Sequence, residues 1–72
     1  MTEYEELVKK FGFVEGGVGT NEDGEYCIVT IDKESASIRT LQNNGWIREN
    51  TYYPDGTEEE GYTKWSIMQY SI

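Results

Sequence analysis

Apolar side chains first recur along the chain at a helical spacing. Positions i, i+3, i+4 and i+7 of one face are occupied by Tyr4, Leu7, Val8 and Phe11. Thr2 and Glu5 have the S/T-x-x-E spacing of a capping box, in which each side chain accepts a hydrogen bond from the other residue's backbone amide. Gly12 follows, where helices commonly end on a left-handed residue. The pattern predicts a helix over residues 2–12 that packs on one face of a sheet.

The pattern changes after the predicted helix. Residues 15–24 hold four glycines among acidic and polar side chains, which predicts a flexible loop. Residues 25–32, Glu-Tyr-Cys-Ile-Val-Thr-Ile-Asp, are rich in β-branched residues and almost continuously apolar. Such a run is typical of a central strand that is covered at least partly on both faces.

A first hairpin is predicted around residues 43–45. This segment carries the Asn-Gly pair that is typical of hairpin loops, and it separates predicted strands at residues 37–42 and 46–53. A three-residue loop with Gly45 in the left-handed region would set Leu41 opposite Ile47, and Arg39 opposite Glu49. Both are favourable cross-strand pairs.

A second hairpin is predicted around residues 53–57. Pro54, Asp55 and Gly56 suit successive positions of a tight turn. The resulting register sets two cation–π candidates opposite one another, which are Arg48 with Tyr62 and Trp46 with Lys64. The final stretch, Trp65–Ile72, is β-prone and could form a fifth strand at an edge.

These elements predict the α+β class. The chain is expected to be a single domain, residues 1–72, with the N-terminal helix packed on a four- to five-stranded antiparallel β-meander over about residues 25–72. One alternative stays open, because residues 34–43 could form a second helix with Ile38 and Leu41 inward. The buried sheet face also stays open, since one alternating set competes with another: Ile38, Trp46 and Tyr52 against Leu41, Ile47 and Tyr53.

Composition limits how this fold is stabilised and what it binds. A chain of 72 residues has a thin core, and with one cysteine and no histidine it has neither an intrachain disulfide nor the usual ligands of zinc and copper. We therefore expect no cofactor and no metal. Fourteen acidic against six basic residues give a net charge of −8. That charge repels nucleic acid and anionic membranes and attracts basic protein surfaces.

The sequence also predicts a cytoplasmic location. No apolar run approaches the roughly 20 residues that span a bilayer. The N-terminus reads Met-Thr-Glu-Tyr-Glu-Glu, which is acidic where a signal peptide is basic and then apolar. A lone thiol suits a reducing compartment.

Each candidate for catalysis lacks a required feature. The segment Gly16–Thr20 resembles a phosphate loop only in its glycines, since it has no lysine and does not lie between a strand and a helix. Cys27 lies within an apolar strand, and the chain has no histidine to act as its base. Glu58, Glu59 and Glu60 would alternate between the two faces of a strand. We therefore expect that the protein is not an enzyme.

What remains is a surface pattern in which carboxylates are interleaved with tyrosines. Tyrosine is enriched at protein interfaces, so this pattern predicts a partner-binding surface, although acids also serve solubility. The expected binding residues are Asp55, Glu58, Glu59, Glu60, Tyr52 and Tyr53, with Glu22 and Asp23 as second choices.

The leading hypothesis is an inhibitor that occupies the basic, nucleic-acid-binding surface of a partner protein as a nucleic-acid mimic. Small acidic inhibitors of phages and mobile elements, including anti-CRISPR proteins, are similar in size and charge, but no motif here identifies such a family. One alternative is a structural or regulatory module that forms homodimers or larger homo-oligomers through Trp65–Ile72. A weaker one is a cation or small-ligand binder that uses the glycine-rich segment.

Overall fold

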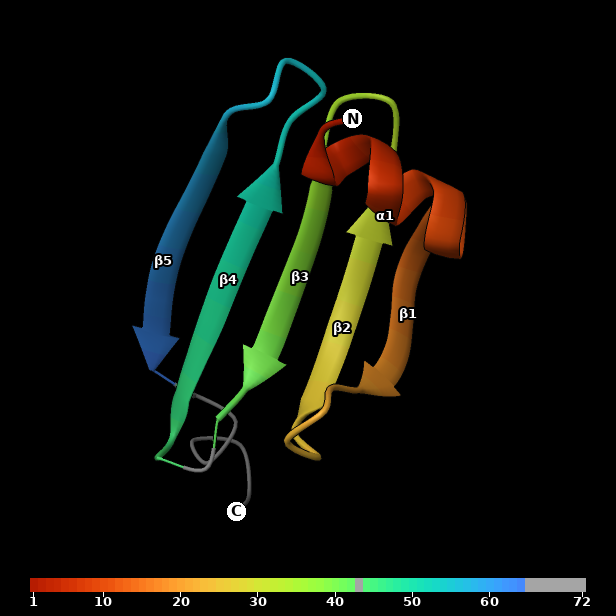
Figure 1. Ribbon diagram of the computed structural model, residues 1–72. Helices are drawn as coiled ribbons and strands as arrows, with labels where there is room; N and C mark the ends of the chain where they lie inside the picture. The colour runs from red at the N-terminus through yellow and green to blue at the C-terminus, as the bar shows by residue number, and fades with distance from the viewer. Residues whose placement is uncertain (43, 65–72) are drawn as a thin grey trace.

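A computed structural model describes residues 1–42 and 44–64 of the chain (Figure 1). One helix precedes five strands, in the order α1 Glu3–Phe11, β1 Val14–Thr20, β2 Tyr26–Ile31, β3 Ala36–Leu41, β4 Trp46–Tyr52 and β5 Glu58–Lys64. The strands form one antiparallel sheet in chain order, so β1 and β5 are its two edges. The predicted α+β class, a helix on an antiparallel meander, is confirmed.

The start and end of α1 follow the predicted capping residues. The Glu5 amide donates to Thr2 Oγ1 at 3.2 Å, and the Thr2 amide donates to Glu5 Oε1 at 2.8 Å. The Thr2 hydroxyl also donates to Glu5 Oε1, at 3.3 Å, and the bonds from the Thr2 amide and hydroxyl favour the ionised carboxylate and lower the pKa of Glu5. Gly12 ends the helix with φ 72°, and its amide donates to the Val8 carbonyl at 2.7 Å. The predicted capping box and C-terminal glycine are both confirmed.

The core lies where α1 crosses the end of the sheet at which β2 ends and β3 begins (Figure 1). It consists of four buried residues, Tyr4, Leu7, Ile31 and Ala36. The Tyr4 hydroxyl also donates to the Asp32 carbonyl at 2.6 Å, which gives the buried phenol a polar partner. Ile38 and Tyr52 pack against this core, whereas Leu41 and Ile47 lie on the other face.

One member of the predicted apolar stripe lies outside the core. Phe11 is 47% exposed, and the Lys10 ammonium lies 5.1 Å from the centre of its ring. Its ring lines an open groove between α1 and the sheet and is not part of the core cluster.

The glycine-rich segment was predicted as a loop over residues 15–24, and that prediction is wrong for its first half. Val14–Thr20 is strand β1, which pairs with β2 along its length. Gly16, at φ 69°, lies at an irregularity in this pairing, and its amide donates to Thr30 Oγ1 at 3.2 Å. Glycine side chains contribute nothing to the stability of a strand, so the backbone pairing with β2 holds β1 in place. A tight turn at residues 21–25 connects β1 to β2.

The register of the remaining strands agrees with the prediction. Residues 36–41 are strand and not helix, and Leu41 lies opposite Ile47. Arg39 lies opposite Glu49, with an ion pair of 2.8 Å between Nε and Oε2.

Two further expectations have different outcomes. Arg48 faces Tyr62 and Trp46 faces Lys64 as predicted, although the cation–π contact found among the described residues is the one in α1. The predicted edge strand Trp65–Ile72 lies outside the described residues, and β1 provides the fifth strand. None of the helical structure in residues 1–42 and 44–64 is long and apolar enough to cross a membrane.

Two matched substitutions in β2 test which face is the core. Ile31→Val removes one methyl group from the 2%-exposed side chain under α1 and should lower the free energy of unfolding by about 1 kcal/mol. Ile28→Val makes the same change on the opposite, half-buried face and should cost less than about half of that. Urea unfolding of both variants measures the difference. Equal losses would contradict the assignment of the core.

Candidate functional site

The predicted partner-binding residues gather on the β4–β5 hairpin, but its register divides them. Tyr52 lies opposite Glu58, Thr51 opposite Glu59, and Asn50 opposite Glu60. Alternate residues of a strand point to opposite faces. Glu58 and Glu60 therefore share the helix-bearing face with Tyr52, whereas Glu59 lies on the other face.

A carboxylate from the helix joins this group. The start of α1 lies beside the β4–β5 turn (Figure 1), and a Cβ built on Gly56 would come within 3.8 Å of Thr2 Cγ2. Partial burial, followed by the negative charges of Glu3 and Glu58, raises the pKa of Tyr52. Glu60 acts in the same direction and Arg48 opposes it. We call the set Glu3, Tyr52, Glu58 and Glu60 the acidic corner.

Tyr53 and Glu59 form a separate pair on the opposite side of the hairpin. The Tyr53 hydroxyl donates to Glu59 Oε1 at 2.6 Å, and this hydrogen bond is the main cause that raises the pKa of Tyr53. The hydrogen-bonding groups of the two side chains are paired with each other, because the phenol donates a hydrogen bond to a carboxylate oxygen of Glu59. These two predicted residues therefore do not belong to the acidic corner.

Asp55 stabilises the turn itself. Its Oδ1 accepts from the Thr57 hydroxyl at 2.6 Å and from the Thr57 amide at 3.0 Å. Both bonds favour the ionised form and lower the pKa of Asp55. Its carboxylate is exposed, but these hydrogen bonds support a role in stabilising the turn and not a role in binding a partner.

The second-choice residues, Glu22 and Asp23, lie far from this hairpin. They occupy the turn between β1 and β2, at the other edge and the other end of the sheet (Figure 1). Asn21 organises that turn, since its Oδ1 accepts from the amides of Asp23 and Glu25 at 3.0 Å each. The structure therefore separates the predicted acids into two diagonal corners.

Cys27 is free and buried, and its hydrogen-bond partners among the described residues are a hydroxyl and a backbone carbonyl, neither of which is a base. Its Sγ lies 3.5 Å from Thr40 Oγ1 and 3.7 Å from the Glu25 carbonyl oxygen. Within residues 1–42 and 44–64, no three or more Cys, Asp and Glu side chains form a group that could hold a metal ion.

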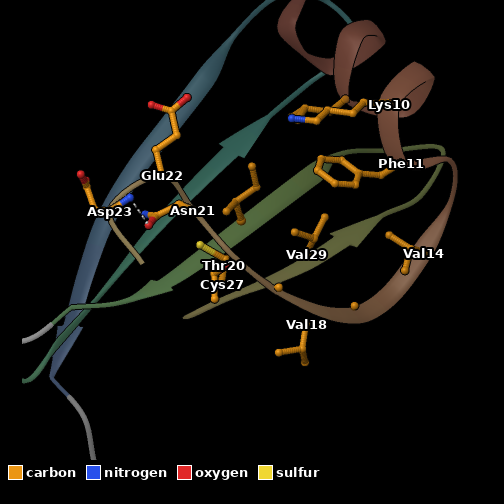
Figure 2. Close-up of a pocket in the computed structure, with 14 residues that line it drawn as sticks. Lys10, Phe11, Val14, Val18, Thr20, Asn21, Glu22, Asp23, Cys27 and Val29 are labelled. Carbon is orange, nitrogen blue, oxygen red and sulfur yellow. Dashed lines mark hydrogen bonds between the residues drawn. The ribbon is translucent and has the colours of Figure 1, made fainter. Parts of the chain in front are cut away.

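The structure also contains a hollow that the sequence did not indicate. A groove of about 620 Å³ lies between the last turn of α1 and the β1–β2 turn (Figure 2). Its residues include Phe11, Gly19, Val29 and Ile38. The alternation of Gly17 and Gly19 was the available signal, since both fall on one face of β1, but it could be interpreted only once the segment was known to be a strand.

Comparison with known proteins gives no further assignment. No protein-family model, no curated protein and no solved structure matches the chain. The function is therefore argued from the geometry of the acidic corner and of the groove.

The electrostatics of the acidic corner can be tested at Tyr52. A nearby carboxylate disfavours the phenolate, so Glu3→Gln should lower the pKa of Tyr52. Glu6→Gln removes the same charge from α1 at a residue that is not among the main causes of the raised Tyr52 pKa, and should change that pKa much less. Titration of the tyrosine ring carbons by NMR measures both. An equal response to the two variants would show that Glu3 does not belong to the corner.

The same shift has a consequence for stability at alkaline pH. The folded-state pKa of Tyr52 is raised, so its neutral form is favoured by folding. Its contribution is complete below the unfolded-state pKa of about 10 and is lost as pH rises through the folded-state value.

Proposed function

We propose that this protein is a non-enzymatic binding module whose acidic corner docks on a basic surface of a partner protein. The observation that supports this most strongly is that Glu58 and Glu60 share one face of β5 while the start of α1, which carries Glu3, lies beside the β4–β5 turn. Carboxylates that lie close together repel one another and give the surface a negative electrostatic potential. A basic partner surface is attracted by this potential and reduces the repulsion. The net charge of −8 also attracts a basic partner over a longer range.

The partner surface that fits best is one that binds nucleic acid. Glu58 and Glu60 are two residues apart on one face of β5, which separates them by about 6.8 Å. Neighbouring phosphates on one strand of duplex DNA have a similar spacing, once the rotation of the strand about the helix axis is added to its rise. Tyr62, 56% exposed, continues the row on the same face and offers an aromatic ring. Carboxylates in place of phosphates, and a ring in place of a base, would exclude the natural ligand.

The position of β5 makes this row accessible. The strand lies at the edge of the sheet, and all seven of its residues are exposed. A partner groove can therefore reach the row without displacing another described element. We further propose that the protein acts in the cytoplasm, where the free thiol of Cys27 stays reduced.

Charge reversal at the acidic corner tests the proposal. The tagged protein is used to capture partners from a bacterial lysate, which are eluted with a salt gradient, and each recovered protein is then tested for displacement of a labelled oligonucleotide. Glu58→Lys together with Glu60→Lys should weaken displacement by about tenfold or more, because attraction becomes repulsion. Rising salt should weaken the wild-type complex, because exposed charges are screened.

A matched pair serves as the control. Glu22→Lys with Asp23→Lys makes the same change in net charge at the diagonal corner and should leave displacement almost unchanged. Circular dichroism of both double variants verifies folding, and Glu58→Gln with Glu60→Gln replaces the lysine pair if that pair unfolds. Equal losses from the two corners would mean that net charge and not the acidic corner carries binding. A complex indifferent to salt would reject the proposal.

A second candidate function, self-association, is favoured by the sheet face that α1 leaves open. Val18 and Tyr26 are 72% and 63% exposed there, beside Ile28, Leu41 and Ile47. These residues cluster at one end of the face, which the Arg39–Glu49 ion pair continues, and an exposed apolar cluster with a polar rim is typical of a protein interface. Light scattering should then give twice the monomer mass, and Tyr26→Lys should restore the monomer. A monomeric wild-type protein would contradict this candidate.

A further inference from the structure

The groove beside α1 has the volume of a small-ligand site. It measures about 620 Å³, within the range of about 300–1,000 Å³ that is typical of such sites. Phe11 on the helix and Val29 on the sheet line opposite sides of it (Figure 2), and Leu7 and Ile38 also belong to its lining. These side chains offer an apolar surface to the body of a ligand.

The floor of the groove is bare backbone. Gly17 and Gly19 lie on the helix-bearing face of β1, opposite Val29 and Cys27. Packing explains why residue 17 is glycine, since a Cβ there would lie 3.0 Å from Val14 Cγ2. Neither packing nor backbone conformation requires glycine at residue 19, because the backbone there is not left-handed and a Cβ would meet nothing within 4 Å.

A glycine inside a strand destabilises it, and it often marks a place where another molecule approaches the backbone closely. Gly19 and Gly61 both lack a steric or conformational role, and of these two strand glycines Gly19 is the one that lines the groove. A side chain at this position would project into the groove. Glycine at this position therefore leaves the groove unfilled, although the strand would accommodate a larger side chain.

Charge is distributed unequally along the groove. Glu22 and Asp23 lie at one end, and both are exposed (Figure 2). The ion pair found among the described residues is elsewhere, between Arg39 and Glu49. At the other end Lys10 lies over the ring of Phe11, so its ammonium already has an attractive partner. Two carboxylates against one engaged ammonium favour a cationic ligand.

We propose that the groove binds a small amphipathic cation, an arylalkyl- or alkylammonium ion. Its apolar body lies on the Gly17–Gly19 backbone between α1 and β2, and its ammonium group lies at Glu22 and Asp23. The site is at the corner diagonal to the acidic corner, so it does not depend on the proposed docking function.

Phenethylammonium is the first probe, followed by amide NMR spectra of the intact protein. The expected result is a saturable shift of the Gly17, Gly19 and Val29 amides, with little change on β5. Hydrocinnamate carries the same ring with a carboxylate in place of the ammonium, and should bind at least about threefold more weakly. Equal or tighter binding of hydrocinnamate, or shifts that do not saturate, would overturn the proposal.

Filling the groove separates ligand binding from stability. Gly19→Val should weaken phenethylammonium binding by about tenfold or more, because the new side chain occupies the floor. It should also stabilise the strand, because valine favours strands and glycine does not. Gly61→Val is the matched control, since Gly61 also lies in a strand with nothing within 4 Å of a Cβ, but on β5. Unchanged affinity in Gly19→Val, or equal losses in both variants, would overturn the proposal.

Neutralising the acidic end tests the cation selectivity. Glu22→Gln with Asp23→Asn should weaken binding by about threefold to tenfold, which is the range for two exposed charge interactions. Glu58→Gln with Glu60→Gln removes the same charge at the acidic corner and should leave affinity unchanged. Equal weakening by the two pairs would show a response to net charge alone and would overturn the assignment of Glu22 and Asp23.

Discussion

The fold depends on one packing constraint: a single short helix has to bury the sheet. A helix of nine residues is about 13.5 Å long, whereas five strands span about 19 Å and are themselves about 20 Å long. Tyr4 and Leu7 can therefore cover Ile31 and Ala36 and little else. Because the helix cannot cover the rest of the sheet, residues 1–42 and 44–64 leave one face of it uncovered and a groove beside α1.

The two candidate sites lie at opposite ends of α1. Its first turn brings Glu3 to the carboxylates of β5, and its last turn brings Lys10 and Phe11 over the bare backbone of β1. This distribution also suits the helix dipole, which favours acids at the N-terminus and bases at the C-terminus. At the acidic corner the helix charge adds to that of β5, whereas at the groove Lys10 opposes the carboxylates of Glu22 and Asp23.

The glycine-rich strand shows where local and tertiary preferences diverge. Glycine has a low strand propensity, so Gly16, Gly17 and Gly19 indicated a loop. In the fold the segment follows α1 directly and lies beside β2, whose backbone groups on that side need partners. The hydrogen bonds of an antiparallel pair are made by backbone atoms, so they form without side chains.

The sequence by itself determined the features that depend on neighbouring residues: the capping box of Thr2 and Glu5, the strand character of β2 to β4, and the pairing of Arg39 with Glu49, which the loop length sets. Only the tertiary structure decided which face is buried, because Ile38 and Leu41 are equally apolar and the position of the helix chooses between them. It also divided the predicted acids into two corners, added Glu3 to one of them and opened the groove beside the other. Those outcomes depend on where α1 lies across the sheet, and that position is set by packing between residues far apart in the chain.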